Sequence, residues 1–171
     1  MKSYQGKGVY GAIAIGKISL LNKPEAAVKR VRVDDTDGEK SRFEQAKASS
    51  LSQLQEIYDK ALKEVGEANA AIFEIHQMML DDEDYNESIN NIIETQSVNA
   101  EYAVAVTADN FAEMFSSMDD AYMKARAADV RDISNRIISN LTGETSKGNF
   151  SDEKVIICAS DMAPSETVSL D

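Results

Sequence analysis

Apolar residues recur at intervals of three and four along most of the chain, which is the spacing of one face of an α-helix. The clearest run follows Thr36 and Glu39, whose spacing predicts a capping box, and it continues until Gly66. Its apolar positions are Leu51, Leu54, Tyr58, Ala61 and Val65. The pattern therefore predicts a long amphipathic helix that begins near Thr36 and ends at Gly66.

Four further helices are predicted by the same spacing. They are marked in turn by Ile72, Ile75 and Met79; by Tyr85, Ile89 and Ile92; by Val104, Ala108, Phe111 and Phe115; and by Val130, Ile133, Ile137 and Leu141. The acidic run 81–84 is suited to capping the third helix, and Asp119 or Asp120 is suited to capping the fifth, which Gly143 closes. Because the connections are short, we expect an antiparallel bundle.

The two ends of the chain follow a different pattern. Residues 8–21 alternate apolar and small positions between glycines, which predicts a strand, and residues 155–158 (VIIC) predict a second strand. Residues 28–33 indicate a short extended piece, and Pro164 opens a last helix. The expected fold class is therefore mainly α, with an antiparallel helical bundle inserted in an incomplete α/β domain.

This organisation divides the chain into three parts. Residues 1–33 should supply the first strands of the α/β domain, and residues 34–143 should form the helical domain. Residues 144–171 should supply a return linker, a strand and the start of a helix.

Composition and charge narrow the class of partner. The chain is 43% apolar, enough for a core, and its formal net charge is −12. That charge argues against nucleic acid or an anionic membrane surface as the partner. One cysteine and one histidine cannot build a disulfide or a zinc site, and no run is long enough to span a membrane. We expect a soluble, cytoplasmic protein.

The charge is concentrated in one stretch. From Glu64 to Met123 there are fourteen Asp or Glu residues and not one Lys or Arg. Such a stretch can be a merely solvated surface, but a field of one sign also raises the encounter rate with a basic partner. Because self-repulsion without internal partners is unfavourable, we interpret it as a surface for a basic partner.

The same stretch holds five of the seven methionines of the chain. Methionine adapts its shape, and partner-binding grooves are rich in it. We assign Met114 to the bundle core. The other apolar candidates are interpreted as an apolar docking patch with an acidic rim, and they are Met78, Met79, Met123, Tyr85 and Tyr122.

Other polar positions are candidates for chemistry or ion pairing. His76 is interpreted as a rim or hydrogen-bonding residue, because a phosphoryl acceptor would need an anion cradle that the sequence around it lacks. Arg126, one helical turn beyond Tyr122, is placed beside the docking patch, and Arg131 and Asp132 are expected to form ion pairs. No self-sufficient active site and no metal site is predicted.

Four segments of the chain resemble the Enzyme I family, the phosphoenolpyruvate-protein phosphotransferases. Their order and spacing agree with that family over essentially the entire chain, with one departure, since Val9 and Tyr10 stand where the family usually has Ser-Pro. The segments are residues 11–17 (GAIAIGK), 71–84 (AIFEIHQMMLDDED), 122–133 (YMKARAADVRDI) and 163–170 (APSETVSL).

The resemblance implies a mechanism shared between domains. Phosphoenolpyruvate and Mg²⁺, bound in a separate carboxy-terminal barrel, phosphorylate a histidine of the α/β domain. The phosphoryl group then passes to the phosphocarrier HPr, which docks on the helical domain. The accepting histidine is expected beyond Asp171, so the resemblance implies no catalytic residue, no cofactor and no activity for this chain alone. The parent would be a homodimer through its barrel, and this chain a monomer.

The resemblance also implies which residues contact HPr. Met79 and Tyr85 would be apolar anchors, and the carboxylates would orient the basic face of HPr. The implied set is Glu67, His76, Met78, Met79, Asp82, Glu83, Asp84, Tyr85, Met118, Tyr122, Met123 and Arg126. Two alternatives remain open: a related swivelling-domain enzyme, such as a phosphoenolpyruvate synthase or the phosphotransfer subunit of dihydroxyacetone kinase, and a non-catalytic helical interaction module.

Overall fold

The computed structural model describes residues 8, 11, 13–21, 28–143, 155–159 and 162–168, and the chain forms two compact units. The strand unit comprises Met1–Pro24 and Lys147–Asp161. The helical unit comprises Glu25–Ser146 and Met162–Asp171.

The strand unit contains two paired strands. β1 (Lys17–Leu21) lies parallel to β2 (Val155–Ala159), with Lys17 opposite Val155 and Leu21 opposite Ala159. Parallel strands need a long crossover connection, and here the bundle helices lie in the chain between them. The prediction of a bundle inserted in an α/β part is confirmed. The strand expected over residues 8–21 is too long, because β2 pairs only with residues 17–21, and the described residues before Lys17 have no regular structure.

The first helix of the bundle, α1, spans Thr36–Glu64. Its cap is Asp35 and not Thr36, since Oδ1 of Asp35 accepts a hydrogen bond from the Gly38 backbone N–H at 2.8 Å. A Cβ at Gly38 would collide with the Asp35 carboxylate, so glycine permits this cap. Glu39, expected in a capping box, instead accepts the backbone N–H of Ala100 at 2.8 Å and pairs with Arg42.

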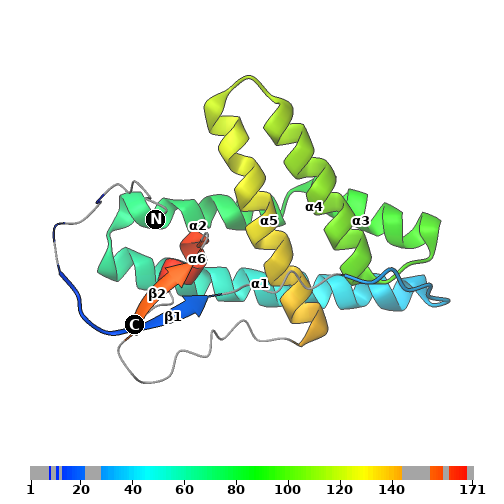
Figure 1. Ribbon diagram of the computed structural model, residues 1–171. Helices are drawn as coiled ribbons and strands as arrows, with labels where there is room; N and C mark the ends of the chain where they lie inside the picture. Colours follow the sequence, from blue (N-terminus) through cyan, green and yellow to red (C-terminus); the bar gives the residue numbers. More distant parts are fainter. Residues whose placement is uncertain are drawn as a thin grey trace, which may run out of the picture. The chain divides into compact units, whose positions relative to one another are not determined.

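Four more long helices follow, as the spacing predicts. They are α2 (Glu67–Leu80), α3 (Glu83–Gln96), α4 (Ala100–Ser117) and α5 (Ala121–Thr142). Asp82 and Asp120 cap α3 and α5 by accepting backbone N–H groups at 2.9 Å. Gly66 and Gly143 both have a positive φ at helix boundaries, and Gly143 takes the left-handed helical conformation. Figure 1 shows α2 running back along α1, and α4 and α5 forming an antiparallel hairpin.

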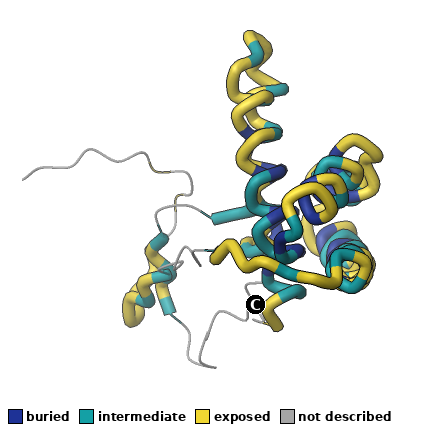
Figure 2. Tube along the Cα trace, turned by 90° about the vertical axis from the view of Figure 1, so that its right-hand side faces the viewer, coloured by how far each residue is buried: buried dark blue, intermediate teal, exposed yellow. Residues whose placement is uncertain are grey.

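The core lies where the apolar faces of these helices meet. Its largest fully buried apolar side chains include Phe43, Leu54, Phe73, Leu80, Ile89, Ile93, Ile133 and Ile137. Figure 2 shows buried residues where helices face one another, whereas the free end of the α4–α5 hairpin carries mostly exposed and half-buried residues. None of the helices in the described part of the chain combines the length and apolar character needed to cross a bilayer.

Two short segments at the edges of the predicted bundle also belong to the helical unit. The Val33 backbone N–H donates to the Ser97 carbonyl at 2.9 Å, which ties residues 31–33 to the turn after α3. The last helix, α6 (Pro164–Val168), places the Ser165 hydroxyl 3.1 Å from the Asp132 carboxylate, and Val168 packs against the core. The structure therefore groups both segments with the bundle, whereas the sequence assigned them to the α/β part.

Candidate docking site

Burial divides the residues expected at the docking patch into three groups. The exposed residues are Glu67, Met78, Asp82, Glu83, Asp84 and Tyr122. The half-buried residues are Met79, Met118, Met123 and Arg126, and the buried ones are His76 and Tyr85. We call the exposed and half-buried members the docking face. Of its large apolar side chains, Met78 is 72% exposed and Tyr122 is 60% exposed.

The turn between α2 and α3 sets the acidic part of the docking face. The Asp82 side chain caps α3, and the Asn86 side-chain amide donates to the Leu80 carbonyl at 2.9 Å, which fixes the chain between the two helices. Glu83 and Asp84 occupy the first turn of α3, where the helix dipole favours carboxylates. Met78 lies two residues before the end of α2. Glu67 begins α2, so it lies roughly 20 Å from Asp82 at 1.5 Å per residue.

The start of α5 contributes an ordered cation and an aromatic ring. The Arg126 guanidinium lies over the Tyr122 ring, 4.3 Å from its centroid. The same guanidinium donates through Nη1 to Oδ2 of Asp129 at 2.7 Å. Arg126 therefore lies beside Tyr122, as the helical spacing predicted. The Tyr122 ring and the Asp129 carboxylate together fix the orientation of its guanidinium.

Tyr85 is not on the docking face, contrary to the expectation that it anchors a partner. It is 2% exposed, its ring packs edge-on against Phe111, and its phenol oxygen lies 2.7 Å from the Ser134 hydroxyl. Burial raises the pKa of Tyr85 to about 12. The spacing of Tyr85, Ile89 and Ile92 already placed Tyr85 on the apolar stripe of its helix, and this stripe faces the core.

His76 is not a rim residue either, because its side chain is completely buried. Its Nε2 lies 3.3 Å from Oδ1 of Asp129 and its Nδ1 lies 3.6 Å from Oδ2 of Asp132, both on α5. The Phe73 ring packs edge-on against it, with centroids 6.0 Å apart. Neither ring nitrogen has a partner in hydrogen-bond geometry within the described residues.

Sequence reasoning missed this buried charged cluster. Asp132 was expected to form an ion pair within or between helices, and it faces His76 and Ser165, while Arg131 is exposed. Burial raises the pKa of Asp132, although the charges of His76 and Arg136 and the Ser165 hydrogen bond act against that rise. The available signal was the spacing of three between Asp129 and Asp132, which places both carboxylates on one helix face.

Met114 also departs from its expected place. It was assigned to the core, but it is 45% exposed. It lies near the free end of the α4–α5 hairpin, where Figure 1 shows the two helices extending beyond the other helices of the unit. Only the α5 side of α4 is covered there, which explains the exposure of Met114.

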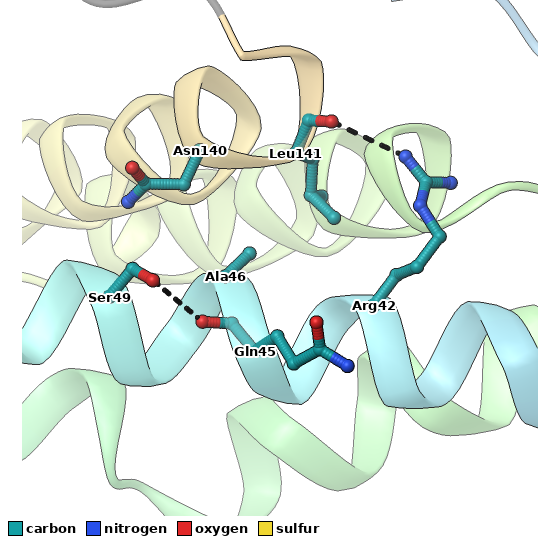
Figure 3. Close-up of a pocket in the computed structure, with 6 residues that line it drawn as sticks. All are labelled: Arg42, Gln45, Ala46, Ser49, Asn140 and Leu141. Atoms are coloured by element: carbon teal, nitrogen blue, oxygen red, sulfur yellow. Dashed lines mark hydrogen bonds between the residues drawn. The ribbon is translucent and has the colours of Figure 1, made fainter.

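Two pockets of the helical unit lie away from the docking face. The first, of about 230 Å³, lies between α1 and the end of α5 and is lined by Arg42, Gln45, Ala46, Ser49, Asn140 and Leu141. Figure 3 shows Arg42 directed at the Leu141 carbonyl, and this guanidinium also binds Glu39 and Glu101. The second, of about 540 Å³, is lined by residues 95–98 together with Arg30 and Arg32.

The described residues hold no group of three or more His, Cys, Asp and Glu side chains arranged to bind a metal ion. The docking face presents carboxylates, an exposed methionine and an oriented arginine to another molecule. The fold defines a class: a helical bundle inserted in an α/β unit.

Comparisons with known proteins place this chain in a family. The family model described as "PEP-utilising enzyme, N-terminal" matches residues 5–126, so the chain belongs to that family. The chain is 40% identical over 171 residues to the phosphoenolpyruvate-protein phosphotransferase of Bacillus subtilis (strain 168), covering 99% of this chain and 30% of the relative. The enzyme of the same name from Enterococcus faecalis is 40% identical over 169 residues, covering 98% and 29%.

Solved structures agree with the sequence comparisons. An NMR solution structure of an Enzyme I protein matches with a TM-score of 0.76 and 34% identity, covering 90% of this chain and 63% of that one. An N-terminal domain of Enzyme 1-Nitrogen matches with a TM-score of 0.72 at 21% identity, which shows the fold alone. The resemblance to Enzyme I is confirmed, and the chain spans about a third of the length of the curated relatives.

Proposed function

We propose that this chain is the amino-terminal part of a phosphoenolpyruvate-protein phosphotransferase and that its docking face binds the small basic phosphocarrier HPr. The family and the names of the relatives, which are transferases, support the first half. One observation carries the second half. The stretch with fourteen acidic and no basic residues places exposed Asp82, Glu83 and Asp84 beside the exposed Met78.

The residues of this chain would act by binding and orientation. The acidic field speeds the encounter with a basic surface and weakens as salt rises. Exposed Met78 supplies apolar area that loses water on contact, and the surrounding carboxylates fix the register of the partner. Arg126, held against Tyr122, supplies the one cation of the face and favours a carboxylate or a helix end on the partner.

The phosphoryl-transfer chemistry is assigned to other parts of the parent enzyme. The single histidine of the sequence, His76, is sealed in the bundle and cannot meet a phosphohistidine of a partner. The described residues do not fit a magnesium site, so no step proposed for this chain runs through the ion. Phosphoenolpyruvate and Mg²⁺ would bind elsewhere in a cytoplasmic parent protein.

A titration with HPr followed by amide chemical shifts tests the proposal. At low salt, the amides of the docking face should shift, and the affinity should fall steeply as salt is added. Asp84→Lys should weaken binding about tenfold. The matched control Asp59→Lys reverses a charge at an exposed site on α1 and should change the affinity for HPr little. Unshifted amides at low salt, or equal effects of both reversals, would count against HPr docking at this face.

A further inference from the structure

The turn between α2 and α3 joins two unlike parts of the docking face. Met78, the most exposed of its large apolar side chains, lies two residues before the end of α2, and Glu83 and Asp84 begin α3. A partner that covers Met78 and pairs with these carboxylates needs the two at a fixed spacing. Docking therefore depends on how firmly this turn is held.

The charges of the turn do not hold it. Its four consecutive carboxylates, from Asp81 to Asp84, are all exposed, and like charges so close together repel one another. The helix dipole favours Glu83 and Asp84 at the start of α3, but it disfavours Asp81 at the end of α2. The last turn of α2 has no basic residue that would offset this repulsion. The order of the turn must come from another group.

The side chain of Asn86 is that group. Its Nδ2 donates to the Leu80 carbonyl at 2.9 Å and to the Asp82 carbonyl at 2.6 Å, so both amide protons are used. Leu80 is the last residue of α2, where carbonyls lack a partner within the helix, and Asp82 is the cap of α3. We call these two bonds the Asn86 clamp, because they join the end of one helix to the cap of the next.

Only the nitrogen of the Asn86 amide fits this position. It faces two carbonyl oxygens, which accept hydrogen bonds and cannot donate them. The Asn86 Oδ1 is buried and has no hydrogen-bond partner among the described residues, a cost that the two bonds of Nδ2 offset. Neither alanine nor an ionised aspartate at position 86 could make either bond.

We propose that Asn86 is a positioning residue for the docking face: the Asn86 clamp holds Met78 and the carboxylates of α3 at the spacing that a basic partner requires. The face then meets its partner already ordered, so less entropy is lost on binding. Asn86 itself need not touch the partner. This inference rests on the proposed function for the identity of the partner, whereas the clamp is tested in the free chain.

The first test follows the free chain by nuclear magnetic resonance. The side-chain amide protons of Asn86 should exchange with water about tenfold more slowly than those of the exposed Asn110. Asn86→Ala should increase the backbone mobility of residues 81–84 in relaxation measurements. The matched control is Asn90→Ala, since Asn90 is half-buried one turn further along α3 and makes no side-chain hydrogen bond to a described residue. It should leave residues 81–84 as ordered as in the wild type.

The second test measures HPr binding. Asn86→Ala should bind HPr roughly three- to tenfold more weakly than the wild type, and Asn90→Ala should bind as the wild type does. Because Asn86→Ala removes no charge, its affinity should fall with rising salt at the wild-type slope, whereas Asp84→Lys should flatten that slope. Wild-type affinity of Asn86→Ala would overturn the positioning role, even if urea unfolding showed that the variant is less stable.

A further substitution sets charge against order. Asn86→Asp keeps the size of the side chain and adds a negative charge to a face that attracts a basic partner, but it places a carboxylate against two carbonyl oxygens. Charge alone would tighten HPr binding, whereas loss of the Asn86 clamp weakens it. We expect weaker binding, and equal or tighter binding would refute the proposal.

The two proposals fail in different ways. If the wild-type chain binds no HPr, the docking function fails, while the mobility of residues 81–84 in Asn86→Ala still decides whether the Asn86 clamp orders the turn. If Asn86→Ala does not fold, the wild-type chain decides alone. Slow exchange of the Asn86 amide protons together with a rigid turn would then support the proposal, and exchange as fast as that of Asn110 would refute it.

Discussion

The phenol oxygen of Tyr85 lies 2.7 Å from the hydroxyl oxygen of Ser134, which joins the first turn of α3 to the middle of α5 inside the bundle. Ser134 donates its single hydroxyl proton to the Val130 carbonyl at 2.6 Å, so the Tyr85 hydroxyl is the donor to Ser134. Tyr85 is therefore a structural tie between two helices and not a contact for a partner.

Tyr85→Phe should lower the free energy of unfolding by about 1 kcal/mol, because it removes one buried hydrogen bond while Ser134 keeps its bond to Val130. Tyr85→Ala should cost about 3–5 kcal/mol through the cavity that it leaves. Urea denaturation measures both. The affinity of Tyr85→Phe for HPr should equal that of the wild type. A marked loss of affinity would show that Tyr85 contacts HPr after all.

The ionisation of Tyr85 should make the chain less stable at high pH. Burial raises the pKa of Tyr85 to about 12 in the folded chain, against a value near 10 when unfolded. The neutral phenol is thus favoured by folding, and its contribution is complete below pH about 10 and is lost as pH rises towards 12. An ultraviolet titration of the six tyrosines should show one phenol that ionises last or only on unfolding. Tyr85→Phe should lack that phenol.

The cap of α1 gives a paired prediction. Asp35→Ala should lower the free energy of unfolding by about 1 kcal/mol, because the Gly38 backbone N–H loses its acceptor. Thr36→Ala should have a smaller effect, since Thr36 is the first residue of the helix and not its cap. Thermal or urea unfolding compares the two variants. If Thr36→Ala lowered the free energy of unfolding more than Asp35→Ala did, the result would support the capping box inferred from the sequence.

Met78 should contribute to HPr binding without contributing to stability. Met78→Ala should weaken HPr binding about tenfold, since a methionine that is 72% exposed in the free chain loses its water only when a partner covers it. Its unfolding should be unchanged. Val31→Ala is the matched control: Val31 is also an exposed apolar residue, but it lies beside the turn after α3. Isothermal titration calorimetry measures the affinity of each variant for HPr, and equal affinities of Met78→Ala and Val31→Ala would contradict the prediction.

Most of the secondary structure followed from local rules. Helical spacing is a property of neighbouring residues, so the five long helices and the closing Gly143 could be predicted along the chain. The sequence narrowed the caps to the acidic run 81–84 and to Asp119 or Asp120, and the structure selects Asp82 and Asp120. The errors occurred where the choice depended on a distant partner. β1 is the segment that pairs with β2, a segment far away in the sequence, and the Glu39 side chain accepts the backbone N–H of Ala100 instead of capping its own helix.

The sequence by itself determined the helical bundle, the acidic stretch from Glu64 to Met123 and the family likeness, because periodicity, charge and motif order are all written along the chain. The tertiary structure alone decided which members of the expected site can be reached. A periodic pattern places His76 and Tyr85 on helix faces but cannot say which helix covers those faces. Packing against α5 buried both, and it set Asp129 and Asp132 against the His76 ring.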